Sequence, residues 1–130
     1  MKKKIKIMIA GGCGFIGSSL AQFFLSKYLK SKIYVLDNLI RLGSELNLNR
    51  LHNDRLIFIK GDLSNKTTFS NLPICDVFID AAADPSVLSG IKSPISKLIN
   101  NNFISSLNAI EWCAKTKWKF LFLSTSRVYP

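Results

Sequence analysis

Residues 8–24 read MIAGGCGFIGSSLAQFF and place four glycines among the seven residues 11–17. A short apolar run precedes the glycines, and apolar residues at helical spacing follow them. Gly11, Gly14 and Gly17 form the pattern G-x-x-G-x-x-G. Between a parallel strand and a helix, the first glycine permits a tight turn, the second lets the backbone approach a ligand, and the third lets the helix pack close to the sheet. This stretch therefore predicts an α/β fold whose first strand leads into a helix with an anion-binding N-terminus.

The rest of the sequence repeats this alternation of strand and helix. Short apolar runs predict strands at residues 4–10, 33–36, 56–59, 76–82 and 119–123, and periodic stretches predict helices at residues 15–30, 44–51, 65–71 and 95–115. The alternation predicts a Rossmann-type doubly wound parallel sheet with strand order 3-2-1-4-5, in a single domain over residues 1–130. We expect the fold to be truncated before strand six, which would leave the last strand as an exposed apolar edge.

The charge is strongly positive, with 18 Lys and Arg against 8 Asp and Glu and a net charge of +10. One interpretation is a polyanionic partner such as nucleic acid or a phospholipid surface. The other, which we favour, is a solvated lysine-rich surface, because most of the lysines are scattered along the sequence. Basic and aromatic residues interleave only at Lys117-Trp118-Lys119, so a nucleic-acid-binding domain ranks last among the functions considered.

Three cysteines, Cys13, Cys75 and Cys113, are far apart and lack metal-binding spacing. We expect reduced thiols, no metal site and a cytoplasmic location. Cys13 lies in the glycine stretch, where a helix N-terminus could lower the pKa of its thiol; the alternative is that a small residue simply fits there. The N-terminal apolar run is interrupted by Lys6 and is too short for a signal peptide, and no stretch approaches the length of a membrane span.

Asp37 is the first residue outside the glycine stretch that fits a dinucleotide. It ends the predicted second strand, 20 residues after Gly17, and can accept hydrogen bonds from both hydroxyls of an adenosine ribose. A carboxylate there repels a 2′-phosphate, which favours NAD over NADP. Arg41 lies nearby in sequence and could instead hold a 2′-phosphate, cap the loop or meet substrate.

Two further strand ends carry residues suited to the same ligand. After the third strand, Asp62 can meet the adenine amino group while Leu63 packs on the ring; the alternative is an Asp turn that caps the next helix. After the fourth strand, the small residues Ala81, Ala82 and Ala83 let a cofactor lie against the backbone, or simply allow tight packing of helix on sheet.

Five short motifs occur in the order G-G-x-G-F-I-G-S, L-D-N-L, G-D-L, an A-A after the fourth strand, and S-T-S-x-V-Y. As a set they resemble the extended short-chain dehydrogenase/reductases, the family of NAD-dependent sugar-nucleotide epimerases and dehydratases. The matches run from Ile7 to Tyr129, essentially the whole chain. Three longer stretches, DNLIRLGSELNLNRL, IDAAADPSVLSGI and LFLSTSRVYP, are similar to the branch of CDP-paratose 2-epimerases.

The resemblance implies a role for each matched position. The NAD pyrophosphate would be held by Gly11, Gly14 and Gly17, with the amides of Phe15 and Ile16. The adenosine ribose would be held by Asp37 and Asn38, adenine would be flanked by Asp62 and Leu63, and the cofactor cleft would be lined by Ala82 and Ala83. The nicotinamide side would be faced by Asn102, and the reacting sugar hydroxyl would be bound by Thr125, with Ser124 before it. From the residues alone, Asn102 could equally be polarity on a helix surface, and Thr125 a cap on a strand end.

Some positions depart from the family pattern. The family's His-Leu-Ala-Ala reads Asp80-Ala-Ala-Ala here, and its Asn-x-x-Gly-Thr ends in Ser105-Ser106, where Ser105 could crowd the helix packing. The resemblance places the family's catalytic Tyr-x-x-x-Lys a few dozen residues beyond Tyr129, and we expect it to be missing from this chain.

The reaction that the resemblance implies begins with hydride transfer from a sugar carbon to NAD, while the catalytic tyrosine takes the hydroxyl proton, and it ends with return of the hydride. We therefore expect the NAD-binding portion of a sugar-nucleotide epimerase, inactive by itself, that meets a nucleotide sugar only when the catalytic part is supplied. The alternative is a non-catalytic NAD-binding module that pairs with another copy or with a complementing chain at the edge of the fifth strand.

Overall fold

The computed structural model describes residues 4–86, 88 and 91–124, and its elements alternate as the sequence predicts. The strands are β1 (Lys6–Ala10), β2 (Lys32–Asp37), β3 (Leu56–Lys60), β4 (Val77–Asp80) and β5 (Lys119–Phe122). The helices are α1 (Phe15–Lys27), α2 (Ser44–Arg50), α3 (Thr67–Ser70), α4 (Ile95–Ile99) and α5 (Ser105–Thr116), with a π-helical turn, η1 (Asn100–Ile104), between the last two.

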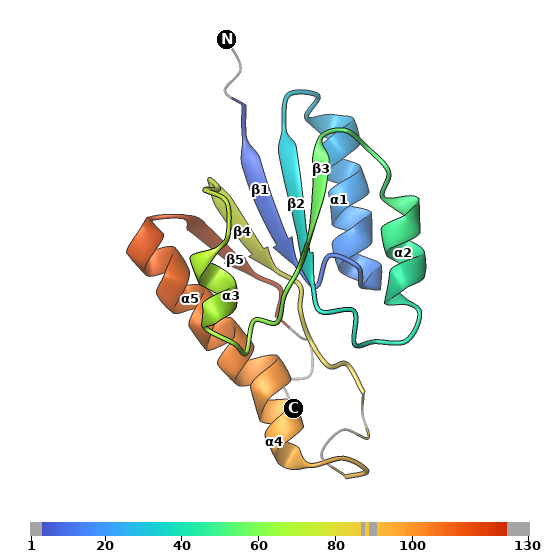
Figure 1. The fold of residues 1–130 in the computed structure, drawn as a ribbon, viewed down its shortest axis with the longest axis vertical. Helices are drawn as coiled ribbons and strands as arrows, with labels where there is room; N and C mark the ends of the chain where they lie inside the picture. The colour runs from blue at the N-terminus through green and yellow to red at the C-terminus, as the bar shows by residue number, and fades with distance from the viewer. Residues whose placement is uncertain (1–3, 87, 89–90, 125–130) are drawn as a thin grey trace.

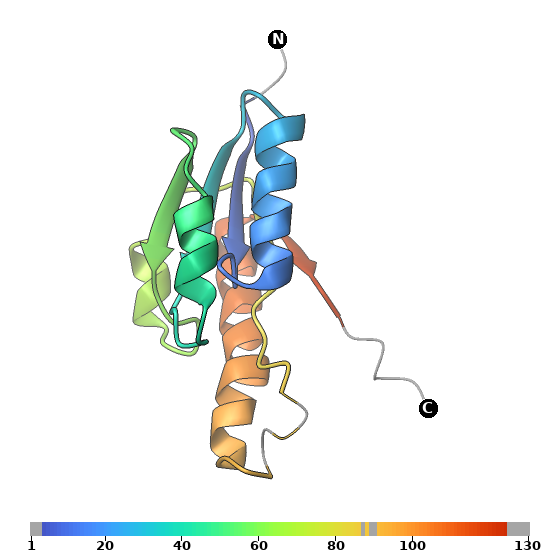
Figure 2. The same cartoon turned by 90° about the vertical axis from the view of Figure 1, so that its right-hand side faces the viewer.

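The strands form one parallel sheet in the order β3-β2-β1-β4-β5, which confirms the predicted Rossmann-type fold (Figure 1). Successive side chains of a strand point to opposite faces of the sheet. Ile7 and Ile9 of β1 belong to the core under α1 and α2, whereas Met8 and Ala10 belong to the core under α3 and α5. Helices thus cover both faces (Figure 2), and the carboxyl ends of all the strands meet at one edge, where folds of this type bind ligands.

The helices contact the sheet through small residues, a feature that the spacing of apolar residues did not predict. In α1, Phe23 is 53% exposed, although its spacing is typical of a buried helix face. Small side chains let a helix lie close to a sheet, so a large residue such as Phe23 can lie outward while Leu25 remains buried. The buried residues are Gly17, Ser18, Ala21 and Leu25 in α1, and Ser105, Ser106, Asn108, Ala109 and Cys113 in α5.

β5 lies at one edge of the described sheet, as predicted. Its Leu121 and Phe122 side chains are 48% and 52% exposed, and no strand within the described residues pairs with the outer side of β5. An exposed apolar edge of this kind pairs readily with another strand.

Candidate dinucleotide-binding site

The glycine turn between β1 and α1 is packed too tightly for side chains. Gly11 has a φ of +66°, and a Cβ added to it would lie 2.7 Å from both the carbonyl oxygen of Ala81 and the Cα of Ala82. A Cβ on Gly17 would collide with the carbonyl oxygen of Gly11. By contrast, a Cβ on Gly14 would meet a single atom within 4 Å, the Gly11 carbonyl oxygen at 3.1 Å. The turn is therefore closed at Gly11 and Gly17 and more open at Gly14, where a ligand could approach the backbone.

The first turn of α1 faces the same edge of the sheet with its backbone donors. Phe15 and Ile16 begin the helix, and their side chains are 85% and 56% exposed. Among the described residues, no side chain caps this N-terminus, and its first turn contains no acidic residue. Uncapped N–H groups and the positive end of the helix dipole suit a phosphate group.

Asp37 at the end of β2 is bonded to the glycine turn. Its Oδ2 accepts a hydrogen bond of 2.9 Å from the backbone N–H of Cys13, and its Oδ1 accepts one of 2.8 Å from the N–H of Leu39. On the opposite side of the turn, the Asn47 side chain of α2 donates to the carbonyl oxygen of Cys13 at 2.9 Å. Two elements thus hold the turn through one peptide segment. Sequence reasoning missed Asn47, because nothing in SELNLNR distinguishes it from its neighbours.

The thiol of Cys13 is buried inside this arrangement. Burial, together with the negative charge of Asp37, raises the pKa of the Cys13 thiol to about 12. The expectation that the helix N-terminus could lower this pKa is therefore wrong, and the alternative of a small residue that fits the turn agrees with its full burial.

Asp62 of the G-D-L motif is bonded to the turn that follows β3 and to the end of β2. Its Oδ1 accepts hydrogen bonds from the N–H and hydroxyl of Ser64 at 2.8 Å and 2.7 Å, which forms an Asp turn, but among the described residues no side chain caps α3. Its Oδ2 accepts from the Asn38 side chain at 3.4 Å, so the ends of β2 and β3 lie side by side. Burial raises the pKa of Asp62, but the hydrogen bonds from Ser64 and Asn38 outweigh it and leave the pKa below its usual value. Leu63 is 6% exposed and belongs to the core.

The segment that follows β4 is held by the helix that includes η1 and α5. Asp80, 1% exposed, accepts hydrogen bonds from the Ser106 hydroxyl at 2.6 Å and from the Ala82 N–H at 3.2 Å. The Asn102 side chain accepts from the N–H of Asp84 at 2.6 Å and donates to its carbonyl oxygen at 3.3 Å. Asn102 is therefore not merely a polar residue on a helix surface, because its side chain is hydrogen-bonded to the backbone of another segment. Burial raises the pKa of Asp80 even though both hydrogen bonds lower it.

Ser105, where the family has glycine, is accommodated by the π-helical turn. Its backbone N–H bonds to the carbonyl oxygen of Asn100, and its hydroxyl donates to the same oxygen at 2.8 Å. The Ser105 side chain is thus bonded within its own helix while it is only 4% exposed.

The predicted catalytic positions are only partly within the described residues. Ser124 follows β5 and is exposed, and Thr125 lies outside the described residues. The chain does contain the spacing Tyr-x-x-x-Lys at Tyr28 and Lys32, although not at the position that the resemblance implies for the catalytic pair. The structure places Tyr28 at the C-terminal end of α1 and Lys32 at the start of β2, at the amino edge of the sheet and away from the glycine turn.

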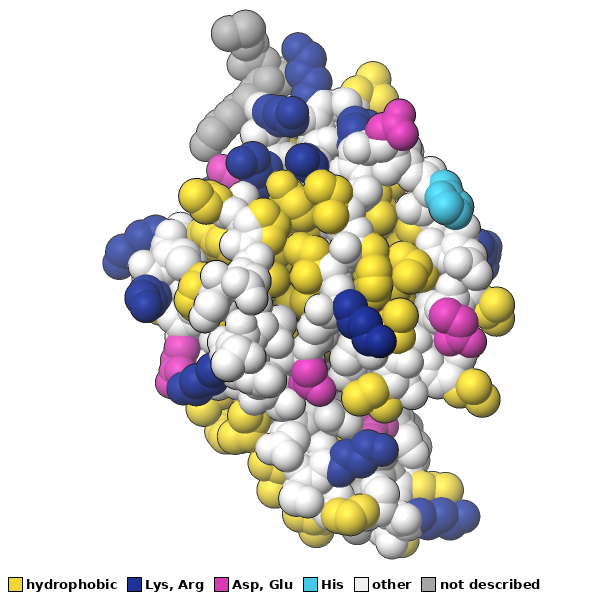
Figure 3. Space-filling view, viewed as in Figure 1, with side chains coloured by type: hydrophobic (Ala, Val, Ile, Leu, Met, Phe, Trp, Pro, Cys, Tyr) yellow, Lys and Arg dark blue, Asp and Glu magenta, His cyan; other side chains and the backbone are white. Residues whose placement is uncertain are grey.

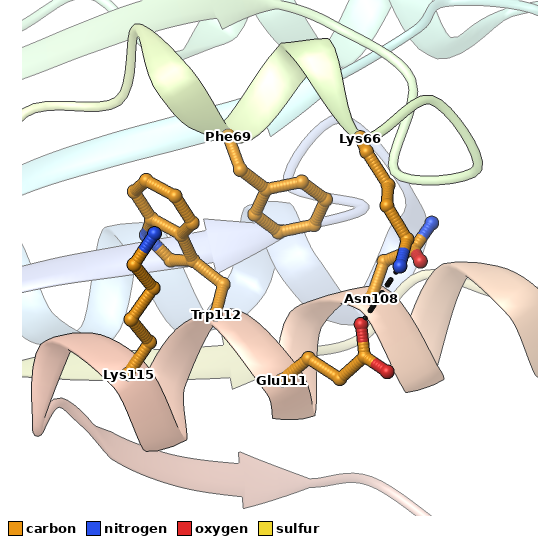
Figure 4. A pocket seen from close by; sticks show the side chains of 6 residues that line it. All are labelled: Lys66, Phe69, Asn108, Glu111, Trp112 and Lys115. Atoms are coloured by element: carbon orange, nitrogen blue, oxygen red, sulfur yellow. Dashed lines mark hydrogen bonds and ion pairs between the residues drawn. The ribbon is translucent and has the colours of Figure 1, made fainter.

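A hollow of about 200 Å³ lies between α3 and α5, away from the glycine turn (Figure 4). Lys66 and Glu111 form an ion pair of 2.9 Å across it, and the indole N–H of Trp112 has no hydrogen-bond partner among the described residues. The hollow is smaller than usual ligand pockets. None of the predicted cofactor residues lines it; its lining is Lys66, Phe69, Asn108, Glu111, Trp112 and Lys115.

On the face of the molecule shown in Figure 3, Lys and Arg side chains form no continuous stripe at the carboxyl ends of the strands. On the face shown in Figure 3, Lys and Arg side chains gather mainly at the end that carries the N-terminus, opposite the carboxyl ends of the strands, and a few stand singly elsewhere. Within the part of the chain that the structure describes, no three potential metal ligands come together, and no helix has both the length and the apolarity to cross a membrane.

Comparisons with known proteins agree with this geometry. Residues 7–130 match the model of the NAD dependent epimerase/dehydratase family. The chain is 35% identical over 129 residues to dTDP-D-glucose 4,6-dehydratase of Dictyostelium discoideum, covering 95% of this chain and 30% of that protein. It is 31% identical over 131 residues to CDP-paratose 2-epimerase of Salmonella typhi, covering 96% and 38%.

A solved structure shows the same similarity in three dimensions. UDP-glucuronic acid 4-epimerase from Bacillus cereus, in complex with UDP-glucuronic acid and NAD, superposes with a TM-score of 0.83 and 30% identity, covering 97% of this chain and 42% of that one. The chain thus spans less than half the length of each of these three proteins.

Proposed function

The chain belongs to the NAD-dependent epimerase/dehydratase family, and from this we propose that it binds NAD at the carboxyl edge of its sheet as the cofactor-binding part of an enzyme that acts on a nucleotide sugar. The resemblance of its motifs and the NAD-containing structural relative support the proposal. When bound, NAD supplies a reversible hydride acceptor. The chain's own residues would bind and orient it, and they would not themselves move the proton.

The observation that carries the proposal is the contact between the glycine turn and Asp37. Gly11 and Gly17 have no room for a Cβ, so the turn and the start of α1 are drawn together. The hydrogen bond from the Cys13 N–H then sets the Asp37 carboxylate beside this turn. A donor-rich helix N-terminus for a pyrophosphate and a carboxylate acceptor for a ribose thus adjoin, in the order along the chain that a dinucleotide requires.

The proposed cofactor is NAD rather than NADP because Asp37 would face the ribose. Oδ1 and Oδ2 each already accept one backbone hydrogen bond, and a carboxylate oxygen can accept a second. A 2′-phosphate would bring like charges together, which costs affinity. Arg41 is exposed. Its backbone carbonyl oxygen accepts hydrogen bonds from the N–H and the hydroxyl of Ser44, and these bonds do not involve its guanidinium.

Calorimetric titration of the chain with NAD and with NADP tests this proposal. We expect saturable NAD binding and NADP binding weaker by about tenfold or more. Asp37→Asn keeps an oxygen for the Cys13 N–H but loses the charge, so it should weaken NAD binding and narrow the difference between the cofactors. Asp54→Asn, at an exposed turn before β3, is the matched control and should change neither. Absence of binding to either nucleotide would contradict the proposal.

For the whole reaction we propose epimerisation of the CDP-paratose 2-epimerase type. The three longer sequence stretches and the 31% identity to the Salmonella typhi enzyme support this choice. Ser124 would lie near the sugar, with Thr125 after it, while the proton-accepting tyrosine and its lysine would come from outside these 130 residues. The chain alone should therefore show no turnover of CDP- or UDP-sugars, and sugar turnover by the purified chain would contradict this assignment.

A second candidate is an NAD-binding module that pairs through its sheet. The exposed apolar edge at Leu121 and Phe122 favours it. Light scattering after size-exclusion chromatography distinguishes the two, since pairing through β5 predicts a dimer that Leu121→Lys converts to a monomer. A chain that is monomeric at all concentrations would exclude pairing between copies. A cytoplasmic location, in keeping with free thiols at Cys13, Cys75 and Cys113, is part of either proposal.

A further inference from the structure

Two residues that depart from the family pattern contact each other. Asp80 replaces the histidine of His-Leu-Ala-Ala, and Ser106 replaces the threonine of Asn-x-x-Gly-Thr. They lie 26 positions apart in sequence, yet the Ser106 hydroxyl donates to Asp80 Oδ2 at 2.6 Å. Both are buried, at 1% and 9% exposure. The hydrogen bond from Ser106 matters for stability, because a buried carboxylate without a hydrogen-bond partner would lower the free energy of unfolding.

The other oxygen of Asp80 holds the backbone that follows β4. Oδ1 accepts from the N–H of Ala82 at 3.2 Å, so one carboxylate joins α5 to the segment of residues 81–84. Four residues before Ser106, Asn102 holds the far end of the same segment through both polar groups of the Asp84 backbone. The helix thus holds residues 81–84 through two sets of hydrogen bonds, one from Ser106 by way of Asp80 and one from Asn102.

The opposite side of this segment forms the wall of the glycine turn. The carbonyl oxygen of Ala81 and the Cα of Ala82 lie where a Cβ on Gly11 would be, and the Ala81 N–H donates to the carbonyl oxygen of Ala10 at 3.1 Å. A shift of residues 81–84 by a fraction of an ångström would therefore change the space beside the turn.

We propose that Asp80 and Ser106 are positioning residues, whose buried hydrogen bond keeps residues 81–84 seated against the glycine turn and so fixes the shape of the cofactor cleft. The inference rests on the proposed function for the identity of the ligand. It assigns Ser106 an effect on NAD affinity without contact between Ser106 and NAD.

Four variants of the chain test the inference. Ser106→Ala removes the donor, and Ser106→Thr keeps a hydroxyl as the rescue variant. Asp80→Asn can still accept from the Ala82 N–H and can donate to the Ser106 oxygen. Ser31→Ala is the matched control: Ser31 is 1% exposed and its hydroxyl donates to the Tyr28 carbonyl oxygen at 2.7 Å, but it precedes β2 at the amino edge of the sheet.

Amide hydrogen exchange of Ala82, followed by NMR, reports the segment without any ligand. We expect Ser106→Ala to speed this exchange by about tenfold, as for loss of one hydrogen bond to a charged group. Ser106→Thr and Ser31→Ala should leave it within about threefold of the unaltered chain. Unchanged exchange in Ser106→Ala would overturn the inference.

NAD titration of the same variants separates positioning from loss of stability. Ser106→Ala should weaken NAD binding by about tenfold, whereas Asp80→Asn, Ser106→Thr and Ser31→Ala should bind within about threefold. Equal losses in Ser106→Ala and Ser31→Ala would overturn the inference. If the unaltered chain binds no NAD, the proposed function fails, and the Ala82 exchange alone decides whether Ser106 holds the segment.

Discussion

The carboxylate of Asp37 accepts a hydrogen bond of 2.9 Å from the backbone N–H of Cys13, across 24 positions of sequence. The contact joins the end of β2 to the glycine turn that follows β1. Because Asn47 of α2 holds the carbonyl oxygen of the same Cys13, the turn is bonded on both sides before any ligand arrives. Such preorganisation lowers the entropic cost of binding.

We expect Gly17→Ala and Gly14→Ala to have opposite profiles. A Cβ at Gly17 collides with the Gly11 carbonyl oxygen, so Gly17→Ala should lower the free energy of unfolding by about 1–3 kcal/mol, as overpacking does. A Cβ at Gly14 has more room and should cost less stability, but it would stand where a ligand approaches the backbone and should weaken NAD binding. Urea unfolding and calorimetry measure the two effects. A Gly14→Ala chain that binds NAD normally would contradict this division of roles.

Loss of the Asn47 side chain should loosen the glycine turn from one side. Asn47→Ala removes the donor to the Cys13 carbonyl oxygen and should weaken NAD binding by about 1 kcal/mol, a usual value for one hydrogen bond. Asn49→Ala, an exposed neighbour on the same helix α2, is the control and should leave the affinity unchanged. Equal effects of the two substitutions would show that Asn47 acts through helix propensity alone.

The raised pKa of Asp80 predicts how its contribution to stability changes with pH. As pH rises above the usual carboxyl pKa, the unfolded chain loses this proton before the folded chain does, so the contribution of Asp80 to stability falls with pH through that window. Asp80→Asn removes this dependence. The unfolding free energy of the variant relative to the unaltered chain should therefore rise between pH 4 and pH 7, measured by urea unfolding at each pH. Asp54→Asn should show no such rise, and a fall for Asp80→Asn would reverse the assigned sign.

The three buried thiols predict a loss of stability in alkaline solution. Burial is the main cause that raises the pKa of Cys13 and Cys75 to about 12 and that of Cys113 to about 11, from 9.0. Above pH 9 the unfolded chain loses these protons while the folded chain keeps them, so the free energy of unfolding should fall as pH rises from there.

Thiol reactivity provides the matching measurement. At pH 8, a chromogenic disulfide reagent should react slowly with the folded chain and rapidly after denaturation, since the thiolate is the nucleophile. Cys75→Ala should reduce the alkaline loss of stability. Rapid reaction of a thiol in the folded chain would contradict the burial of Cys13, Cys75 and Cys113.

The strands and their order could be predicted because their sequences are apolar on both faces, as in IYVL of β2, and because alternation with helices leaves few topologies. Which face of each helix is buried could not be predicted. Phe23 has the spacing of a core residue, but close approach of α1 to the sheet selects Ala21 instead. Which residues of a helix are buried depends on the element that packs against it. The spacing of apolar residues within one helix carries no information about that element.

Within the site, the glycines and Asp37 could be found from spacing, since their partners lie in one βαβ unit. Asn47 and the pair of Asp80 with Ser106 could not be assigned, because each depends on a contact between distant segments. The only signal was chemical: an aspartate that ends the apolar run VFID is improbable in a core without a buried partner.

The π-helical turn η1 inserts one residue more than an α-helix would need between α4 and α5. Each residue of an α-helix rotates the chain by about 100°. Because η1 already holds the extra residue, deleting one residue within 100–104 would convert η1 to α-helix and leave the side chains of α4 and α5 facing nearly as they do now. A single-residue deletion in this helix should thus be tolerated at η1, whereas one within α5 would rotate the residues on one side of the deletion by about 100° relative to the other.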